Sequence, residues 1–334
     1  VGNLAFAESM QYMDGVKIGV LTGSLLSTLF GLATSLGLGA QQVSAGLNYL
    51  FDIPKTLQTQ ALVIMSITSL AIYSVVRGLD RGVRKLSNIN ISMAACLLLF
   101  VILAGPTKLI LSSYSDNFAN YFVDMFRLST LDRPVDRQWY HDWTIFYWAW
   151  WLALGPQVGL FVTRVSKGRS LRQLITGMIF FGSLGCFLFY MILGNYAINL
   201  ELSGQLAVSE LLVNEGHRIT ATKVLLTLPF GSFFLFAYCL MVVIFIATSY
   251  DSVSYVIAYH VKRTSSEMNE PDRKMRLFWA FILAILPAAL FIIDLNRVAM
   301  DVILLMSLPL LFICPVLAVS LVRTLKNHYS ENNQ

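Results

Sequence analysis

The densest group of side chains suited to chemistry is the segment WTIFYWAWW at residues 143–151. Tryptophan is common where a helix crosses a membrane surface, and Trp143 fits that ordinary role. Trp148, Trp150 and Trp151 cannot all point toward one surface, because neighbouring residues of a helix point about 100° apart. At least one of these indoles must therefore face protein or a cavity. Several indole faces could hold a quaternary ammonium, because one face attracts a desolvated cation by about 2 kcal/mol.

A second group of polar side chains is FIATSYDS at residues 245–252. Hydroxyl groups inside membrane helices often bond a carbonyl one turn earlier, and Thr248 and Ser249 could do only that. Sodium, however, is held by a few hydroxyl and carbonyl oxygens, preferably where a helix is distorted. Asp251 is ionisable and lies in or at the edge of a span, which makes it a functional candidate. The alternative, that Asp251 anchors the helix end beside basic loops, stays open.

Signatures of catalysis are absent from the sequence. HExxH, GxSxG and the P-loop pattern do not occur, and the four histidines lie in loops or near the ends of apolar stretches. The small residues from Thr28 to Gly39 include a GxG, but without a βαβ context it is no dinucleotide fingerprint. They predict close helix packing or a loosened helix. The cysteines lack CxxC spacing and are interpreted as small buried hydrophobes. They are Cys96, Cys186, Cys239 and Cys314. We expect no enzyme, no cofactor and no metal site beyond sodium.

The elements that carry these groups must be membrane helices. Of the 334 residues 56% are hydrophobic and 13% are charged, whereas soluble domains have roughly a quarter charged. The apolar residues come in runs of about 20, which suits helices and not an alternating outer-membrane barrel. The sequence therefore predicts an all-α integral membrane protein built as a multi-span helical bundle. Eight spans are expected, at roughly 16–38, 58–77, 90–112, 142–163, 173–199, 225–258, 275–294 and 298–322.

The charges of the connections indicate an orientation. Basic residues gather after the second, fourth and sixth spans and in the tail, whereas the other connections are neutral or acidic. Basic loops face the cytoplasm, so both ends of the chain are expected there. The net charge of +5 is therefore an orientation signal, and no nucleic-acid partner is expected. Contact with anionic lipids is a secondary expectation.

A long connection separates the first three spans from the last five. Within it, Phe118, Tyr121, Phe122, Met125 and Phe126 follow the spacing of an amphipathic helix. Such a helix could lie in the membrane interface or could pack between two bundles. The sequence leaves both alternatives open.

Several segments resemble the betaine–choline–carnitine transporter family. They are WTIFYWAWW followed by Gly155-Pro156, TRVSKGRSLRQ (163–173), TLFGLATSLGLGAQQVSAGL (28–47), RGVRKLSNIN (81–90) and FIATSYDS (245–252). The matches are collinear and cover nearly the whole chain. The resemblance implies part of a LeuT-like inverted-repeat transporter fold. The chain would hold spans five to twelve of the family's twelve.

This resemblance also implies a domain division. Residues 1–112 would be the last three helices of the first repeat, and 113–141 the extracytoplasmic connection with its amphipathic surface helix. Residues 142–325 would be the second five-helix repeat, and 326–334 the cytoplasmic tail. Because the chain starts at Val1 without methionine, we expect the first four spans and one wall of the site to be missing. We do not expect this chain to work alone.

The resemblance implies a substrate site on the tryptophan-rich helix. Trp148, Trp150 and Trp151 match the family motif, and Trp150 is the expected centre of the cation cage. Leu154 departs from the tryptophan of sodium-coupled betaine carriers. Gln157 replaces their usual phenylalanine and is similar to the glutamine of carnitine exchangers.

The coupling ion follows from the same comparison. Phe245, Thr248 and Ser249 match a family sodium site, and Thr28 matches one hydroxyl of a second site whose other hydroxyl is replaced by Leu32. Sodium-independent carnitine exchangers carry an arginine and a methionine as substitutes for sodium, where this chain has Asn90 and Val158. We therefore expect sodium symport with one ion per cycle rather than two.

The expected function is import of an onium solute across a bacterial inner membrane by alternating access. Glycine betaine, choline, carnitine and dimethylsulfoniopropionate are the candidate substrates, and the family suggests a homotrimer. Proton-coupled choline uptake or substrate antiport is the alternative. A sodium-coupled amino-acid or sugar symporter and a non-transporting osmosensor of the same fold also remain open. The short, weakly basic tail speaks against strong osmotic regulation.

Overall fold

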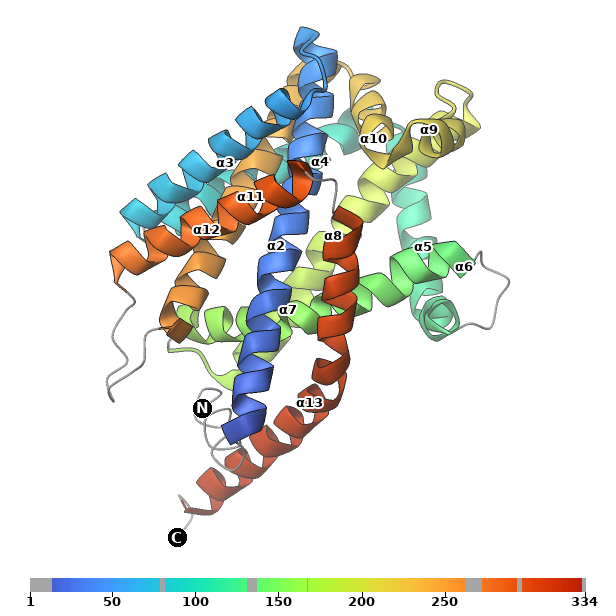
Figure 1. Ribbon diagram of the computed structural model, residues 1–334. Helices are drawn as coiled ribbons and strands as arrows, with labels where there is room; N and C mark the ends of the chain where they lie inside the picture. The colour runs from blue at the N-terminus through green and yellow to red at the C-terminus, as the bar shows by residue number, and fades with distance from the viewer. Residues whose placement is uncertain are drawn as a thin grey trace. The chain divides into compact units, whose positions relative to one another are not determined.

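The computed structural model describes residues 14–78, 82–130, 137–166, 168–261, 272–292 and 296–331, and within these ranges it contains helices and no strand (Figure 1). The helices are α2 (Asp14–Phe51), α3 (Leu57–Arg77), α4 (Arg84–Ala104), α5 (Thr107–Ser129), α6 (Arg137–Tyr140), the π-helical turn η2 (His141–Ile145), α7 (Phe146–Val165), α8 (Leu171–Leu202), α9 (Val208–Asn214), α10 (Gly216–Leu226), α11 (Gly231–Val261), α12 (Arg273–Ile292) and α13 (Asn296–Glu331).

The outer surfaces of these helices are apolar. Large side chains such as Leu103, Phe181 and Phe312 are exposed to their surroundings, although burying such groups away from water is strongly favourable. In the described residues five helices, α3, α4, α8, α11 and α13, are long and apolar enough to cross a membrane. The prediction of an all-α integral membrane protein is confirmed.

In the described residues each expected span overlaps at least one helix, but several ends differ. The expected first span at 16–38 continues as α2 to Phe51. There Asp52 adopts a left-handed conformation with φ of 53°, and its N–H donates to the carbonyl of Asn48 at 3.0 Å. A left-handed residue with such a bond is a common helix end. The expected third span at 90–112 stops as α4 at Ala104, because Gly105 and Pro106 follow and α5 begins at Thr107.

A third difference is a break inside the expected span at 225–258. α10 ends at Leu226 and α11 begins at Gly231. Pro229 lies in the turn between them, and Phe230 has a positive φ of 57°. A proline lacks the N–H that a continuing helix needs, so the chain turns here. The remaining 31 residues of α11 are still more than the roughly 20 that a bilayer requires.

The helices form two compact units, and α2 and α11 contribute to both. The first unit comprises the described residues of Val1–Ser35, Asp136–Gly168 and Ser252–Gln334. In it, α13 packs against α7, which it crosses in Figure 1, and α12 contacts α13. The buried guanidinium of Arg276 on α12 lies over the ring of Tyr255 on α11, 5.1 Å from the ring centroid. A buried cation is thus compensated in part by an aromatic face.

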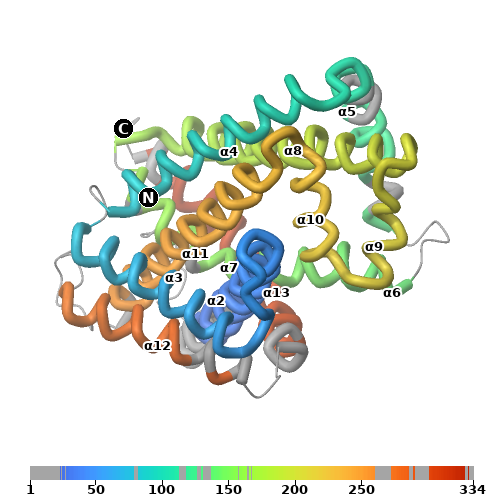
Figure 2. The backbone as a smooth tube through the Cα atoms, turned by 90° about the horizontal axis from the view of Figure 1, so that it is seen from above, coloured from blue at the N-terminus to red at the C-terminus, as the bar shows by residue number. Residues whose placement is uncertain are grey.

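The second unit comprises the described residues of Leu36–Val135 and Arg169–Asp251. Here α4 and α5 both pack on α8, and Figure 2 shows α4 running alongside α8. Phe118 and Tyr121 of α5 each lie 5.2 Å from the ring of Phe187 on α8, measured between ring centroids. The aromatic stripe of α5 therefore contacts another helix while part of each ring stays exposed.

Within the second unit, α2 and α11 approach closely at two glycines. A Cβ atom at Gly39 would overlap Cδ1 of Ile246, and one at Gly46 would overlap Sγ of Cys239. Gly46 lies seven residues after Gly39 on α2, whereas its partner Cys239 lies seven residues before Ile246 on α11. The two segments therefore run antiparallel. Small residues let helix backbones approach in this way. At Gly39, the close packing expected of the small-residue segment is confirmed.

Candidate functional site

The tryptophan-rich segment begins inside one helix irregularity and ends before a second one. The π-helical turn η2 precedes α7 directly, and Pro156 lies inside α7. π-helical turns are frequent at functional sites, and a proline removes one hydrogen bond of the helix and bends it. The segment therefore differs from a regular membrane helix at both ends.

The three indoles of this segment have different surroundings. The half-buried ring of Trp150 meets the buried ring of Phe146 edge-on, with 5.1 Å between ring centroids and 87° between planes. Trp148 and Trp151 are 64% and 66% exposed. Within the described part no ring contact joins the three indoles to one another. The expectation that at least one indole faces protein is confirmed at Trp150.

Leu154 and Trp150 lie on the face of α7 that meets α2. A Cβ atom at Gly31 of α2 would lie 3.3 Å from Cδ2 of Leu154 and 3.8 Å from Nε1 of Trp150. Sequence reasoning missed Gly31 as a site residue. A run of small residues indicates close helix packing but does not identify the helix that packs there. The side chain of Gln157 lies outside the described residues, although its backbone belongs to α7.

The outermost indole fits a membrane-surface role. Trp143 is exposed and stacks on Tyr147, with 5.5 Å between ring centroids and 5° between planes. Amphipathic aromatic rings of this kind are typical of the membrane interface.

On α11, two hydroxyl groups point at one carbonyl oxygen. The Oγ1 of Thr248 donates to the Phe245 carbonyl at 2.8 Å, and the Oγ of Ser249 donates to the same oxygen at 3.0 Å. The adjacent pair Thr34 and Ser35 on α2 behaves differently, because each hydroxyl there bonds a separate carbonyl four residues earlier. The two α11 bonds are also bonds to the preceding turn, but they meet at one carbonyl oxygen.

Three oxygens at one point can hold a small hard cation. A hydroxyl oxygen has two lone pairs and a carbonyl oxygen has two, and oxygen is the donor that such cations prefer. Thr28, expected in a second sodium site, is fully buried on α2 in the first unit. Phe245, Thr248 and Ser249 belong to the second unit.

The acid of the same segment is held by another helix. Asp251 and Ser74 are both fully buried, and the Oγ of Ser74 on α3 donates to Oδ2 of Asp251 at 2.5 Å. A hydrogen bond to a charged acceptor in a low-dielectric interior is among the stronger ones. Sequence reasoning identified Asp251 but missed Ser74, since nothing in the pattern of α3 distinguishes this serine from its neighbours.

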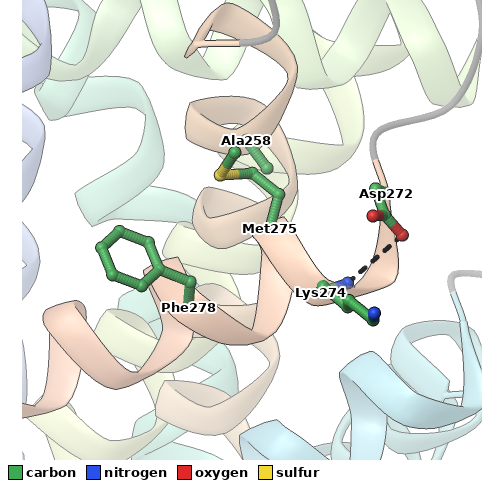
Figure 3. A pocket seen from close by; sticks show the side chains of 5 residues that line it. All are labelled: Ala258, Asp272, Lys274, Met275 and Phe278. Atoms are coloured by element: carbon green, nitrogen blue, oxygen red, sulfur yellow. Dashed lines mark hydrogen bonds between the residues drawn. The ribbon is translucent and has the colours of Figure 1, made fainter.

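A cavity in the first unit contains none of the predicted site residues. It has a volume of about 520 Å³ and is lined by Ala258, Asp272, Lys274, Met275 and Phe278 (Figure 3). The backbone N–H of Lys274 donates to Oδ1 of Asp272 at 3.4 Å, so the carboxylate is engaged with the first turn of α12. The cavity is part of the junction between α11 and α12.

Comparison with known proteins identifies the family. The family model described as BCCT, betaine/carnitine/choline family transporter, matches residues 10–330. The chain belongs to this family. Members of the BCCT family are transporters, so the expectation that the chain is not an enzyme is confirmed.

Three relatives show how far the similarity extends. A glycine betaine/proline/choline transporter of Vibrio parahaemolyticus is 37% identical over 320 residues, which is 96% of this chain and 56% of the relative. The glycine betaine transporter of Bacillus subtilis is 32% identical over 92% of this chain and 59% of its own length. A carnitine transporter of Acinetobacter baumannii is 31% identical over 86% of this chain and 54% of its own length. The chain thus spans between half and two thirds of these relatives.

Proposed function

We propose that this BCCT-family chain forms part of a secondary active transporter that imports a small solute with a methylated onium head. The observation that carries the proposal is the position of Trp150, which is half-buried, braced edge-on by Phe146 and set beside Gly31 between two irregular helix turns. A quaternary ammonium has no hydrogen-bond donor, so aromatic faces are the groups that recognise it.

The candidate substrates are glycine betaine, choline, carnitine and dimethylsulfoniopropionate. The names of the relatives cite glycine betaine, choline and carnitine, which share a trimethylammonium head. Leu154 faces α2 at Gly31 and supplies apolar contact where a further indole would add another cation-binding face. We propose that Trp148, Trp151 and Gln157 complete the lining and that Gln157 interacts with the polar end of the solute.

The proposed coupling ion is sodium, bound by the carbonyl of Phe245 and the hydroxyls of Thr248 and Ser249. A bound ion shifts a conformational equilibrium only by its difference in affinity between the two states. We propose that this site is complete in the substrate-binding state, so that sodium and solute favour the same conformation. Rocking of one helix group against another would then expose both ligands to the opposite side of the membrane. Thr28 contributes to a weakened second site, which makes one sodium ion per cycle the proposed stoichiometry.

The membrane setting completes the proposal. We propose a bacterial inner membrane, both ends of the chain on the cytoplasmic side, a homotrimer, and contact of the basic connections with anionic lipids. The basic connections would meet the negative surface of the cytoplasmic leaflet.

The substrate assignment is tested by replacing Trp150. In protein expressed from its gene and reconstituted in liposomes, Trp150→Ala should raise the betaine concentration for half-maximal uptake about tenfold or more, whereas Trp150→Phe should retain part of the affinity. The matched control is Trp143→Ala, which removes an exposed indole of the same helix and should leave that concentration nearly unchanged.

The same assay separates the alternatives. Equal values for wild type and Trp150→Ala would place the onium head elsewhere. Uptake driven by a proton gradient without sodium would favour proton-coupled choline uptake, and uptake of amino acids or sugars that onium compounds do not inhibit would favour a different symporter.

A further inference from the structure

The first ten residues of α4 carry a groove outside the proposed solute and sodium sites. The inference drawn from it rests on the proposed contact of the basic connections with anionic lipids. It has a volume of about 580 Å³, and two rows of side chains line it. Residues four apart lie above one another on a helix, so these rows form parallel ridges. The rows are Arg84, Asn88 and Ser92 on one side and Lys85, Ile89 and Met93 on the other.

The chemistry of the groove changes along the helix. Its first turn carries the cations, the second carries the amide of Asn88, and the third carries Ser92 and the thioether of Met93. Ten residues rise about 15 Å, and α4 is one of the helices long and apolar enough to span a membrane. The cations come first, and polar Asn88 and Ser92 then lie beside apolar Ile89 and Met93, as a phosphate precedes the glycerol esters and acyl chains in one leaflet.

The positive charge at this edge has no described counter-charge. Arg84 and Lys85 are exposed, none of the described lining residues is acidic, and within the described ranges no ion pair joins either side chain. Arg77 ends the neighbouring helix α3 and lies over the ring of Tyr73, 5.3 Å from the ring centroid. Arg77 therefore adds a third cation seven residues before Arg84 in the chain.

We propose that this groove binds one anionic phospholipid. Arg84 and Lys85 hold its phosphate, Asn88 and Ser92 donate hydrogen bonds to its glycerol and ester oxygens, and Ile89 and Met93 contact an acyl chain. Each basic residue near a membrane surface strengthens binding of an anionic lipid severalfold. The two apolar residues of the second row, Ile89 and Met93, distinguish a lipid from a free phosphate ion, which has no chain to place there.

The proposal is tested by titrating purified protein with dioleoyl phosphatidylglycerol and counting bound lipids by native mass spectrometry. The double variant Arg84→Gln and Lys85→Gln should weaken retention of the lipid about tenfold or more. The matched control, Arg169→Gln with Arg172→Gln, removes the same charge from the exposed start of α8, where the proposed lipid contact is diffuse, and should lower retention far less than the Arg84 and Lys85 variant does. Dioleoyl phosphatidylcholine should be retained weakly by all three proteins.

A second variant tests the acyl contact. Met93→Ser should weaken retention of the dioleoyl lipid and leave binding of dihexanoyl phosphatidylglycerol, whose chains are short, almost unchanged. Equal losses in both double variants would show diffuse charge and overturn the site. Full competition by inorganic phosphate at millimolar concentration, or no effect of Met93→Ser on either lipid, would contradict a lipid occupant. A change of oligomeric state in the Arg84 and Lys85 variant would assign the groove to contact between copies instead.

Discussion

The two hydroxyls that share the Phe245 carbonyl provide the sharpest prediction at the scale of residues. The double variant Thr248→Ala and Ser249→Ala removes two of three oxygens, so the sodium concentration for half-maximal uptake should rise about tenfold or more. The control is Thr34→Ala with Ser35→Ala on α2, whose hydroxyls bond separate carbonyls. Sodium dependence of labelled betaine uptake is the measurement. The same shift in both double variants would mean that the hydroxyls serve only their helices.

The bond between Ser74 and Asp251 allows a second prediction at this scale. Ser74→Ala leaves a buried carboxylate without that donor and should lower the free energy of unfolding by about 1–3 kcal/mol. Ser69→Ala is the control, because the Ser69 hydroxyl is exposed and bonds only the Met65 carbonyl of its own helix. It should change stability by less than about 0.5 kcal/mol. Unfolding in mixed micelles measures both.

A double-mutant cycle isolates this pair. If Ser74→Ala costs as much in an Asp251→Ala background as in the wild type, the hydroxyl does not act through the carboxylate. A clearly smaller cost in that background is the expected result.

At the scale of elements, the antiparallel seam of α2 and α11 depends on Gly39. Gly39→Ala should destabilise the protein by about 1–3 kcal/mol, because the new methyl group meets the Cδ1 atom of Ile246 in a packed interior. Adding Ile246→Val removes that one atom and should recover much of the loss. Gly177→Ala on α8 is the control, since a Cβ there meets nothing within 4 Å. It should be neutral or stabilising by up to about 1 kcal/mol.

Unfolding of these variants in mixed micelles provides the measurement. No recovery by Ile246→Val would show that Gly39 matters for a reason other than this contact.

At this scale, features that depend on neighbouring residues could be predicted from the sequence, whereas contacts between distant segments could not. In the described part of the chain, hydropathy located helices under all expected spans, because about 20 apolar residues in a row are a local property. Two of these spans, 90–112 and 225–258, each cover parts of two helices. The Pro229 and Gly105-Pro106 breaks were also local, and turn chemistry could have placed them. The partner of each face could not be predicted. Periodicity shows that a small-residue face exists, but only the fold shows that Gly31 meets Trp150 while Gly39 meets Ile246.

The amphipathic segment illustrates the same limit. Its aromatic spacing allowed a surface helix or a packing helix, and the structure places Phe118 and Tyr121 against Phe187 of α8. The contact joins residues almost 70 positions apart, roughly the length of three membrane helices. Helical spacing carries no information about such distant partners.

At the scale of the whole molecule, the alternation of basic and non-basic connections predicts the orientation. In a background with its cysteines replaced by serine, Arg169→Cys and Gln205→Cys place single thiols at exposed positions on either side of α8. A membrane-impermeant maleimide should label Gln205→Cys in intact cells and Arg169→Cys only after permeabilisation. The opposite pattern would reverse the orientation.

The central claim is that sodium drives uptake of an onium solute, and one measurement tests it most directly. Protein expressed from its gene is reconstituted in liposomes, and accumulation of labelled glycine betaine, choline and carnitine is followed after an inward sodium gradient is imposed. We predict that at least one of these solutes accumulates above its external concentration and that a sodium ionophore collapses the gradient of solute. Equilibration without accumulation, or accumulation that follows a proton gradient and ignores sodium, would contradict the claim.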